Sequence, residues 1–347
     1  MRLLYIALDP LKYPRIAKIA HTLRKYEDVE FKVMIPKFRF VWRGGKTGRI
    51  LFALVNYLTV LLQIFFLRAD LFWVANCPDI LAVPLILRRK HYILEYRSPW
   101  SLEVENEFGV GPWVRLTAFF EYFALRYASI ITLTTSRLMV NVKRFRKPIF
   151  VIPNYPLKSF GNITVSKEKF REHVGCLTDD RVALFLGKLS RVEGADLLPN
   201  IIQNVLNRAD VVFWIVGGGP LYPSLEKFAK SLPRRVKVFG WRPHQEIPNF
   251  IAAADVCIAP RHRSPYSIFY NEEGVSKLSE YMFFRKPIVA CGVADSEQYL
   301  LVGEDKLADG IVQALNGRVA PPQRRTWEQW SEKKIFEMLD LIHAAKF

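Results

Sequence analysis

Cysteine is scarce in this chain, which has four cysteines in 347 residues. They form no CxxC pair and no zinc-ligand spacing, so we expect neither a disulfide scaffold nor a structural zinc site, but reduced thiols in a cytoplasmic protein. The start of the chain lacks a long apolar run with a small-residue cleavage site, so we expect no signal peptide. Repeats and low-complexity tracts are also missing. Because half of the residues are apolar, the chain is not of the disordered class.

Acidic residues are scarce in the first half of the chain. The whole sequence has 50 Lys and Arg against 33 Asp and Glu, a net charge of +17. Residues 1–160 hold 25 basic and 11 acidic residues, and therefore carry +14 of that excess. Such a charge indicates a polyanionic partner: nucleic acid, an anionic membrane surface or a phosphorylated ligand. We expect the N-terminal half to meet it.

One long run lacks charge altogether. Ile50–Leu67 has 18 uncharged residues, at the lower limit for a membrane-spanning helix. Three interpretations stay open: a helix buried between two strands, which the run favours, a helix at the membrane interface, and a span. The preceding stretch Lys32–Arg49 has six basic and three aromatic residues and no acid. This composition suits an anionic membrane surface, stacking on nucleic-acid bases, or an ordinary solvated loop.

Two series of short apolar runs, separated by longer helical segments, predict an α/β fold with two doubly wound, Rossmann-like domains. The first series is Arg2–Leu8, Val29–Ile35, Asp70–Ala75, Tyr92–Tyr96, Ile130–Leu133 and Ile149–Ile152. The second series is Val182–Leu186, Val211–Val216, Val236–Phe239, Val256–Ala259 and Ile288–Ala290. Pro153–Ser166 is the predicted linker, and Trp327–Ala345 is a predicted last helix.

Glycines follow two strands of the second series. Gly187 is followed by the cations Lys188 and Arg191, and Gly217–Gly219 end the next strand. Glycine lets the backbone approach a ligand at the carboxyl edge of a parallel sheet, and the nearby cations can meet a phosphate. A tight strand-to-helix turn would use glycine as well, so both interpretations stay open.

A helix is expected to begin at Val275 or Ser276. Its first N–H groups and its positive dipole end form an anion site. Lys277 and Glu280 are three residues apart and share one face of this helix. That face can offer a cation to a phosphate and a carboxylate to sugar hydroxyls. The alternative is an ordinary surface ion pair.

Five motifs in order resemble the retaining GT-B glycosyltransferases of family 4. They are Gly187-Lys188, Val216–Pro220, Val238–Trp241, Ala254–Val256 with Ala259-Pro260, and the helix after Gly274. The resemblance covers residues 182–290 well and extends more loosely to 1–156, where Ile152–Asn154 matches the family's linker. It implies glycan biosynthesis by a metal-independent enzyme that takes a sugar from UDP- or GDP-sugar, with retention and without a cofactor.

The resemblance also implies roles for single residues. Glu272 and Glu280 match the family's Glu-x7-Glu pair, in which Glu280 would hold the ribose hydroxyls and Glu272 would lie near the donor sugar. Glu273 directly precedes Gly274, as the first Glu does in the family, and is the alternative to Glu272. The implied donor-binding residues are Gly187, Gly217, Gly218, Gly219, Gly240, Trp241, Gly274, Val275, Ser276, Lys277, Leu278 and Glu280.

Two positions depart from the family pattern. Where the family has Arg and then Lys for the diphosphate, this chain has Lys188 and Glu193. We expect Arg191 to substitute, so that Lys188 and Arg191 act with Glu272 in catalysis, and Arg261 and Arg263 could add charge.

The family's histidine in the N-terminal domain is also missing. The corresponding region is Glu95–Trp100, and Arg97 and Glu103 are the candidates on the acceptor side. The six histidines of the chain show no paired spacing, and each is expected at the surface or in packing.

The resemblance implies two domains that face a cleft: residues 1–157, which bind the acceptor and receive the helix 327–347, and residues 158–326, which bind the nucleotide-sugar. A lipid-linked acceptor would use both the basic stretch and the apolar helix. We therefore expect a peripheral protein on the cytoplasmic face of the membrane, without a nucleic-acid partner. The alternatives are a nucleotide-sugar epimerase of the same fold and a non-catalytic protein that binds membranes or nucleic acid.

Overall fold

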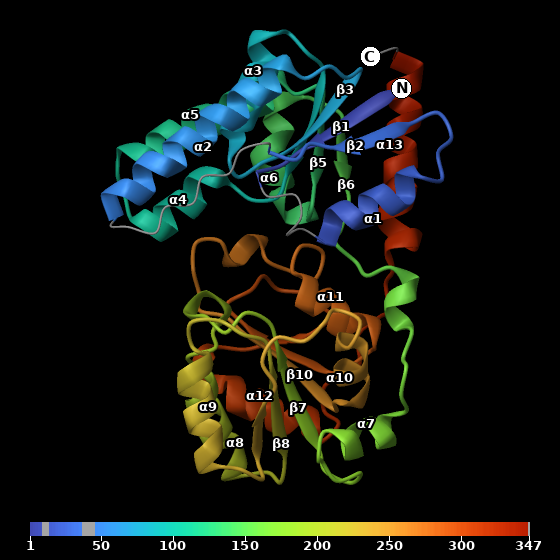
Figure 1. Ribbon diagram of the computed structural model, residues 1–347. Helices are drawn as coiled ribbons and strands as arrows, with labels where there is room; N and C mark the ends of the chain where they lie inside the picture. The colour runs from blue at the N-terminus through green and yellow to red at the C-terminus, as the bar shows by residue number, and fades with distance from the viewer. Residues whose placement is uncertain (9–13, 37–45, 346–347) are drawn as a thin grey trace. The chain divides into compact units, whose positions relative to one another are not determined.

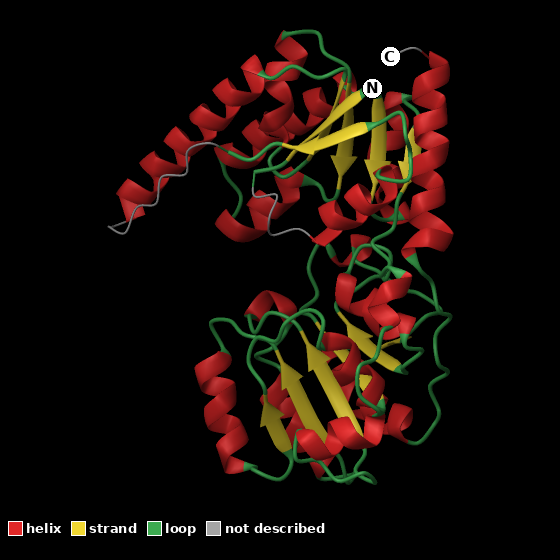
Figure 2. Ribbon diagram, turned by 45° about the vertical axis from the view of Figure 1, so that its right-hand side comes forward, coloured by secondary structure: helices red, strands yellow, loops and turns green. Residues whose placement is uncertain are grey.

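The computed structural model describes residues 1–8, 14–36 and 46–345. The chain divides into two compact units, unit 1 with Met1–Pro153 and Ser331–Phe347, and unit 2 with Asn154–Trp330. Each unit contains one six-stranded sheet with helices packed around it (Figures 1 and 2). All strand pairs are parallel, so the predicted fold of two doubly wound α/β domains is confirmed. The expected boundaries lie within four residues of the observed divisions.

The sheet of unit 1 has the strand order β2-β1-β3-β4-β5-β6. Its strands are β1 (Arg2–Ile6), β2 (Glu30–Val33), β3 (Leu71–Ala75), β4 (Tyr92–Tyr96), β5 (Ile130–Leu133) and β6 (Ile149–Val151). Every residue of β3, β4 and β5 is buried, because helices cover both faces of a parallel sheet of this kind.

The helices of unit 1 include the last helix of the chain. They are α1 (Pro14–Leu23), α2 (Lys46–Phe66), α3 (Val83–Leu87), α4 (Trp100–Phe108), α5 (Pro112–Tyr127), α6 (Met139–Val142) and α13 (Lys333–Ala345). Helix α13 lies beside α1 (Figure 1), where Tyr26 Oη donates to Asp340 at 2.8 Å. Lys25 forms an ion pair of 2.7 Å with Glu332, just before α13.

Helix α2 contains the charge-free run. Its side chains Val60 and Ile64 are buried, whereas Leu58, Leu62 and Phe66 are exposed. The interpretation as a helix buried between strands is therefore wrong for one side of residues 55–66 of α2, the part whose side chains the structure describes. Among the described residues, no helix is both long enough and apolar enough to cross a bilayer. Within the basic stretch, residues 37–45 lie outside the described residues.

The sheet of unit 2 has the strand order β12-β11-β10-β7-β8-β9. Its strands are β7 (Val182–Leu186), β8 (Val212–Val216), β9 (Val236–Val238), β10 (Val256–Pro260), β11 (Ile288–Cys291) and β12 (Leu300–Leu301). Its helices are α7 (Lys167–His173), α8 (Leu198–Leu206), α9 (Tyr222–Ser231), α10 (Ile247–Ala253), α11 (Ser276–Phe283) and α12 (Leu307–Leu315). The two-residue strand β12 was not predicted, since a pair of residues shows no alternation.

Two apolar cores lie on the two faces of this sheet. Trp214 and Tyr281 belong to the core on one face, and Phe213 and Ile311 to the core on the other. Adjacent residues of β8 therefore point to opposite faces, as the two-residue period of a strand requires.

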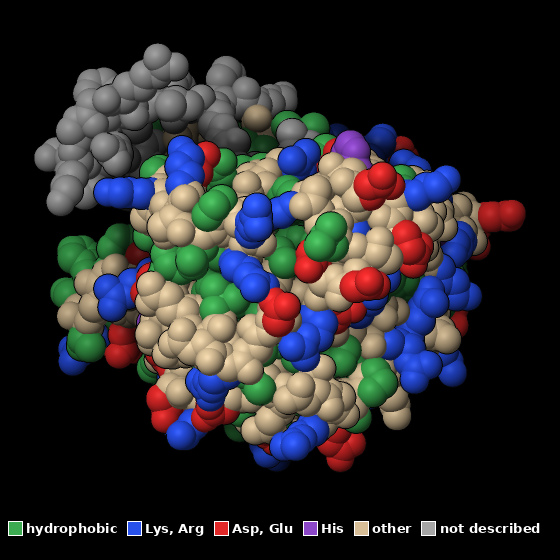
Figure 3. All heavy atoms as spheres, turned by 90° about the horizontal axis from the view of Figure 1, so that it is seen from below, with side chains coloured by type: hydrophobic (Ala, Val, Ile, Leu, Met, Phe, Trp, Pro, Cys, Tyr) green, Lys and Arg blue, Asp and Glu red, His purple; other side chains and the backbone are tan. Residues whose placement is uncertain are grey.

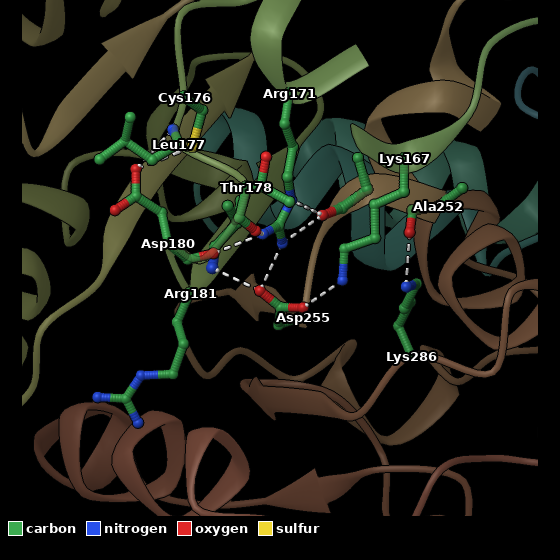
Figure 4. A network of polar contacts seen from close by, with 12 residues as sticks. Lys167, Arg171, Cys176, Leu177, Thr178, Asp180, Arg181, Ala252, Asp255 and Lys286 are labelled. Carbon is green, nitrogen blue, oxygen red and sulfur yellow. Dashed lines mark hydrogen bonds and ion pairs between the residues drawn. The ribbon is translucent and has the colours of Figure 1, made fainter. Parts of the chain in front are cut away.

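Asp255, one of the residues that carry the family resemblance, has a structural role (Figure 4). Its carboxylate accepts from Lys167 Nζ at 2.9 Å, from Arg171 Nη2 at 2.7 Å and from the N–H of Val182 at 2.8 Å. Burial alone would raise the pKa of Asp255, but these hydrogen bonds outweigh burial and lower it. The network fastens α7 to the start of β7, at the opposite edge from the glycine turns.

Candidate functional site

Three turns are joined by backbone hydrogen bonds at the carboxyl ends of β7, β8 and β9. The N–H of Gly187 donates to Val216 O at 3.0 Å, and the N–H of Gly217 donates to Gly240 O at 2.8 Å. The N–H of Leu189 donates to Gly218 O at 2.9 Å. The structure therefore brings the predicted glycines together at one edge of the sheet of unit 2.

Packing alone requires glycine in these turns. Gly217 has a φ of +141°, and a Cβ there would lie 1.8 Å from Gly187 O. Gly219 has a φ of +153°, and its Cβ would lie 2.6 Å from Leu189 O. A side chain at either position would collide with the neighbouring turn. Packing thus explains why these positions are glycine, so the glycines by themselves do not indicate a ligand site. Other groups at this edge have to indicate it.

Trp241 is such a group, since 70% of its surface is exposed. Its indole lies over Gly218, where an added Cβ would be 2.3 Å from Cδ1 of the ring. An exposed aromatic ring held against a glycine turn offers a flat apolar surface at the edge of the site. Such a surface is suited to stacking on a planar ligand.

Helix α11 begins at Ser276, as predicted, after Val275. The turn before it is closed by Asn271, whose carbonyl accepts the N–H of Val275 at 2.9 Å. Asn154 Nδ2 donates to Ser276 Oγ at 2.7 Å. The side chain of Leu278 is fully buried, so a ligand could contact this residue only through its backbone. The helix start therefore offers N–H groups rather than side chains to an anion.

Lys277 does not extend into solvent as a surface lysine would. Its side chain is 8% exposed, and its Nζ lies 2.7 Å from Glu193 Oε2. The ammonium also lies 4.7 Å from the centre of the Phe185 ring and 3.1 Å from the position of a Cβ on Gly187. The alternative of an ordinary surface ion pair with Glu280 is therefore wrong. The cation predicted for phosphate is held between β7 and α11.

Glu193 joins two cations. Its Oε1 lies 3.1 Å from Arg261 Nη1, and the guanidinium of Arg261 lies 4.5 Å from the centre of the Tyr270 ring. Burial opposes the charge on Glu193, but Lys277 and Arg261 outweigh burial and lower the pKa of Glu193. Burial lowers the pKa of Lys277, and Glu193 opposes this shift only in part.

The acid that departs from the family pattern is thus the centre of a buried ion cluster. In the sequence, Glu193 indicates only the loss of a cation, and its link to Lys277 is not apparent. The available signal was Glu193 itself, an acid where the resemblance implies Lys, because a new acid at such a position needs a cation as its partner.

The two cations predicted for catalysis lie at the surface. Lys188 is exposed, and Arg191 is largely exposed with its Nε 3.7 Å from Asp196. His262 lies between Asp196 and Glu304, with a ring nitrogen 3.0 Å from each carboxylate. Burial disfavours the charged ring, but the two acids outweigh it and raise the pKa of His262.

Glu272 is a buried carboxylate, with 5% of its surface exposed. Its Oε2 has no hydrogen-bond partner among the described residues. Burial raises the pKa of Glu272 above its usual range. Glu273 is less buried, and its carbonyl accepts the N–H of Asn154 at 2.6 Å. Of the two alternatives for the first Glu of the pair, Glu272 has the unsatisfied oxygen.

The acceptor-side candidates lie in unit 1, near the carboxyl end of β4. The guanidinium of Arg97 donates to Asn76 O at 2.6 Å, and Glu103 accepts from Ser98 Oγ. Glu95 was not singled out from the sequence, although it is fully buried and accepts from Arg15 Nε at 2.9 Å. The available signal was a charged residue inside the otherwise apolar run Tyr92–Tyr96, because a charged side chain is rarely buried without a partner.

Residues 180–317 match the family model of Glycosyl transferases group 1. The α-D-kanosaminyltransferase of Streptomyces kanamyceticus is 30% identical over 161 residues, which are 46% of this chain and 36% of that protein. This chain covers less than half the length of the curated relatives that it matches, which are named as a kanosaminyltransferase and two glycosyltransferases. The group 1 match contains the glycine turns, the Glu193 cluster and α11.

Solved structures share the fold over nearly the whole chain. HepE of Anabaena, in complex with UDP and glucose, has a TM-score of 0.66 at 16% identity and covers 98% of this chain and 99% of its own. A UDP-N-acetylglucosamine 2-epimerase has a TM-score of 0.63 at 13% identity and covers 100% and 97%. Identities this low support the fold alone, which is the GT-B fold of two Rossmann-like domains.

Proposed function

We propose that this protein is a retaining, metal-independent glycosyltransferase of family 4, which moves a sugar from UDP- or GDP-sugar to a lipid-linked acceptor in glycan biosynthesis. One observation carries the proposal. Inside the segment that matches the group 1 family, the glycine turns, the start of α11 and the unsatisfied Oε2 of Glu272 all belong to the carboxyl edge of one parallel sheet. Ligands of open α/β sheets bind at this edge.

The proposed chemistry depends on charge. As the nucleoside diphosphate departs, negative charge develops on its phosphates. The N–H groups at the start of α11 and the cations Lys188 and Arg191 would stabilise this charge without a metal. Retention by attack on the same face, with the donor phosphate as base, needs no nucleophile from the protein.

The carboxylates have different parts in the proposal. Glu280, one helical turn into α11, would accept from the ribose hydroxyls. Glu272, whose buried Oε2 lacks a hydrogen-bond partner among the described residues, would lie near the donor sugar. Trp241 would lie beside the base.

A binding experiment tests the donor site. Glu280→Ala should weaken UDP or GDP binding by about 10- to 150-fold, because the ribose loses a charged acceptor that contributes roughly 1.5–3 kcal/mol. Isothermal calorimetry measures the change, and circular dichroism checks the fold. Glu172→Ala, which removes an exposed acid from α7, serves as the control. Unchanged nucleotide affinity in a folded Glu280→Ala protein would contradict the assignment.

The acceptor part of the proposal is supported by unit 1. The first half of the sequence carries most of the positive charge, and α2 leaves one apolar side exposed. A lipid-linked acceptor at the cytoplasmic face of a membrane would use both features, whereas a soluble acceptor would need neither. Product analysis separates the proposal from an epimerase of the same fold, because an epimerase alters the nucleotide-sugar without any acceptor.

A further inference from the structure

A surface pocket of about 470 Å³ lies in unit 1. It is lined by three arginines and two aromatic residues: Tyr122, Arg126, Arg144, Phe145 and Arg146. Two separate segments supply it, since Arg126 lies in the last turn of α5 and the other arginines follow α6. None of these residues belongs to a motif that the sequence makes recognisable.

The three arginines lack acidic partners. In the part of the chain that the structure describes, none of them forms an ion pair or a side-chain hydrogen bond. Arg144 instead places its guanidinium 5.0 Å from the centre of the Phe145 ring. Over much of the face drawn in Figure 3, by comparison, basic and acidic side chains are mixed. A pocket that gathers three guanidinium groups without a carboxylate is suited to an anion, and arginine is well suited to phosphate oxygens.

The helix beside the pocket exposes an aromatic and apolar face. Trp113, Leu116 and Phe119 of α5 have 58%, 55% and 55% of their surfaces exposed. Tyr122 continues this face into the pocket, where its ring centre lies 5.6 Å from that of Phe145. Helix α4 packs against α5 (Figure 1), and its end exposes Phe108 as well. A soluble protein seldom leaves so many large apolar side chains together on one helix.

We infer that the arginine pocket binds the phosphate of an anionic phospholipid head group while the exposed face of α5 lies in the bilayer interface. Tryptophan, tyrosine and phenylalanine are favoured at that depth, and basic residues beside them are attracted to the anionic leaflet. A free phosphate compound would use the arginines but would leave the apolar face of α5 without a role. This inference rests on the membrane part of the proposed function and assigns it to α5 rather than to the stretch Lys32–Arg49.

Vesicle binding tests the inference on the full chain. The probes are phosphatidylcholine vesicles with and without 30% phosphatidylglycerol, and inorganic phosphate as the soluble anion. The variant Arg126→Gln/Arg144→Gln/Arg146→Gln should bind the anionic vesicles on the order of 100-fold more weakly, since each basic residue near an anionic leaflet contributes about fivefold. Arg234→Gln/Arg285→Gln/Arg318→Gln removes the same charge from exposed positions of unit 2 and should bind like the wild type.

A second variant separates the apolar face from the charge. Trp113→Ser/Leu116→Ser/Phe119→Ser should keep its fold, because all three side chains are exposed, yet lose vesicle binding at 0.5 M salt, where electrostatic attraction is screened. Equal binding by the pocket variant and the wild type would overturn the inference and leave the membrane proposal intact. Inorganic phosphate that displaces the vesicles at low millimolar concentration would also overturn it, in favour of a soluble ligand. If the wild type binds no vesicles, the inference and the membrane proposal both fail, and nucleotide binding still tests the donor site.

Discussion

The ion cluster around Glu193 predicts a specific stability defect. In Glu193→Gln, Lys277 and Arg261 would remain buried beside each other without an anion. Removing one partner of a buried ion pair typically costs 3–5 kcal/mol. The Glu193 side chain is 21% exposed, so water can partly replace it, and we expect a loss near the lower end, about 3 kcal/mol. For a unit of this size, that corresponds to a melting temperature lower by roughly 6–12 °C.

A double-mutant cycle shows whether the loss comes from the cluster. Lys277→Met should cost less than Glu193→Gln, because Glu193 keeps its partner Arg261 and the methionine fits an apolar environment beside Phe185. Glu193→Gln/Lys277→Met should then be more stable than the sum of the two single losses by at least about 1.5 kcal/mol. Urea unfolding followed through the buried Trp214 supplies the free energies. Losses that add to within 0.5 kcal/mol would refute the coupling.

The dependence of stability on pH provides an independent check on the same cluster. The pKa of Glu193 is lowered by its cations, so its contribution to stability is present above the unfolded pKa of about 4.3 and is lost as the pH falls through the lower, folded value. Wild type and Glu193→Gln should therefore differ most near neutral pH and converge at acidic pH. A difference that does not change with pH would mean that the charge of Glu193 is not the cause.

Three further predictions concern unit 2. Lys188→Ala should weaken the binding of UDP at least tenfold more than the binding of uridine, because a charge-assisted contact to phosphate is lost. Equal losses of affinity for the two ligands in calorimetry would contradict the role of Lys188. Gly217→Ala should lower the free energy of unfolding by 2 kcal/mol or more, on the order expected for strain at positive φ plus a clash with Gly187 O, and an unchanged urea midpoint would count against this geometry. Because the pKa of His262 is raised in the folded state, its charged ring stabilises the fold. This contribution is fully present below a pH of about 6.5 and is lost as the pH rises through the folded pKa. His262→Gln should remove this pH dependence from melting curves.

The strands could be predicted because each is a short apolar run with turn residues beside it. Each of the eleven predicted runs overlaps a strand, and none misses a strand end by more than two residues, since burial on both faces of a parallel sheet leaves a continuous apolar pattern. Strand β12 has two residues and no such pattern. The one-sided burial of α2 was also beyond the sequence, because a helix that is apolar all round does not show which side meets the protein.

The pairing of side chains from distant segments was harder to predict than the positions of helix starts and turns along the sequence. The start of α11 was found from the sequence because helix starts and glycine turns depend on neighbouring residues. The link from Glu193 to Lys277 depends on the approach of two segments that are 84 positions apart in the sequence. The ion pair has a consequence for the proposed function, because it places a buried cation against Gly187 and an acid that holds this cation when no ligand is bound.

A diphosphate at this turn would compete with Glu193 for Lys277. Glu193→Gln, although less stable, should therefore bind UDP about threefold or more tightly than the wild type in calorimetry at 15 °C. Weaker UDP binding by a folded Glu193→Gln protein would instead show that Glu193 positions the cation for the ligand.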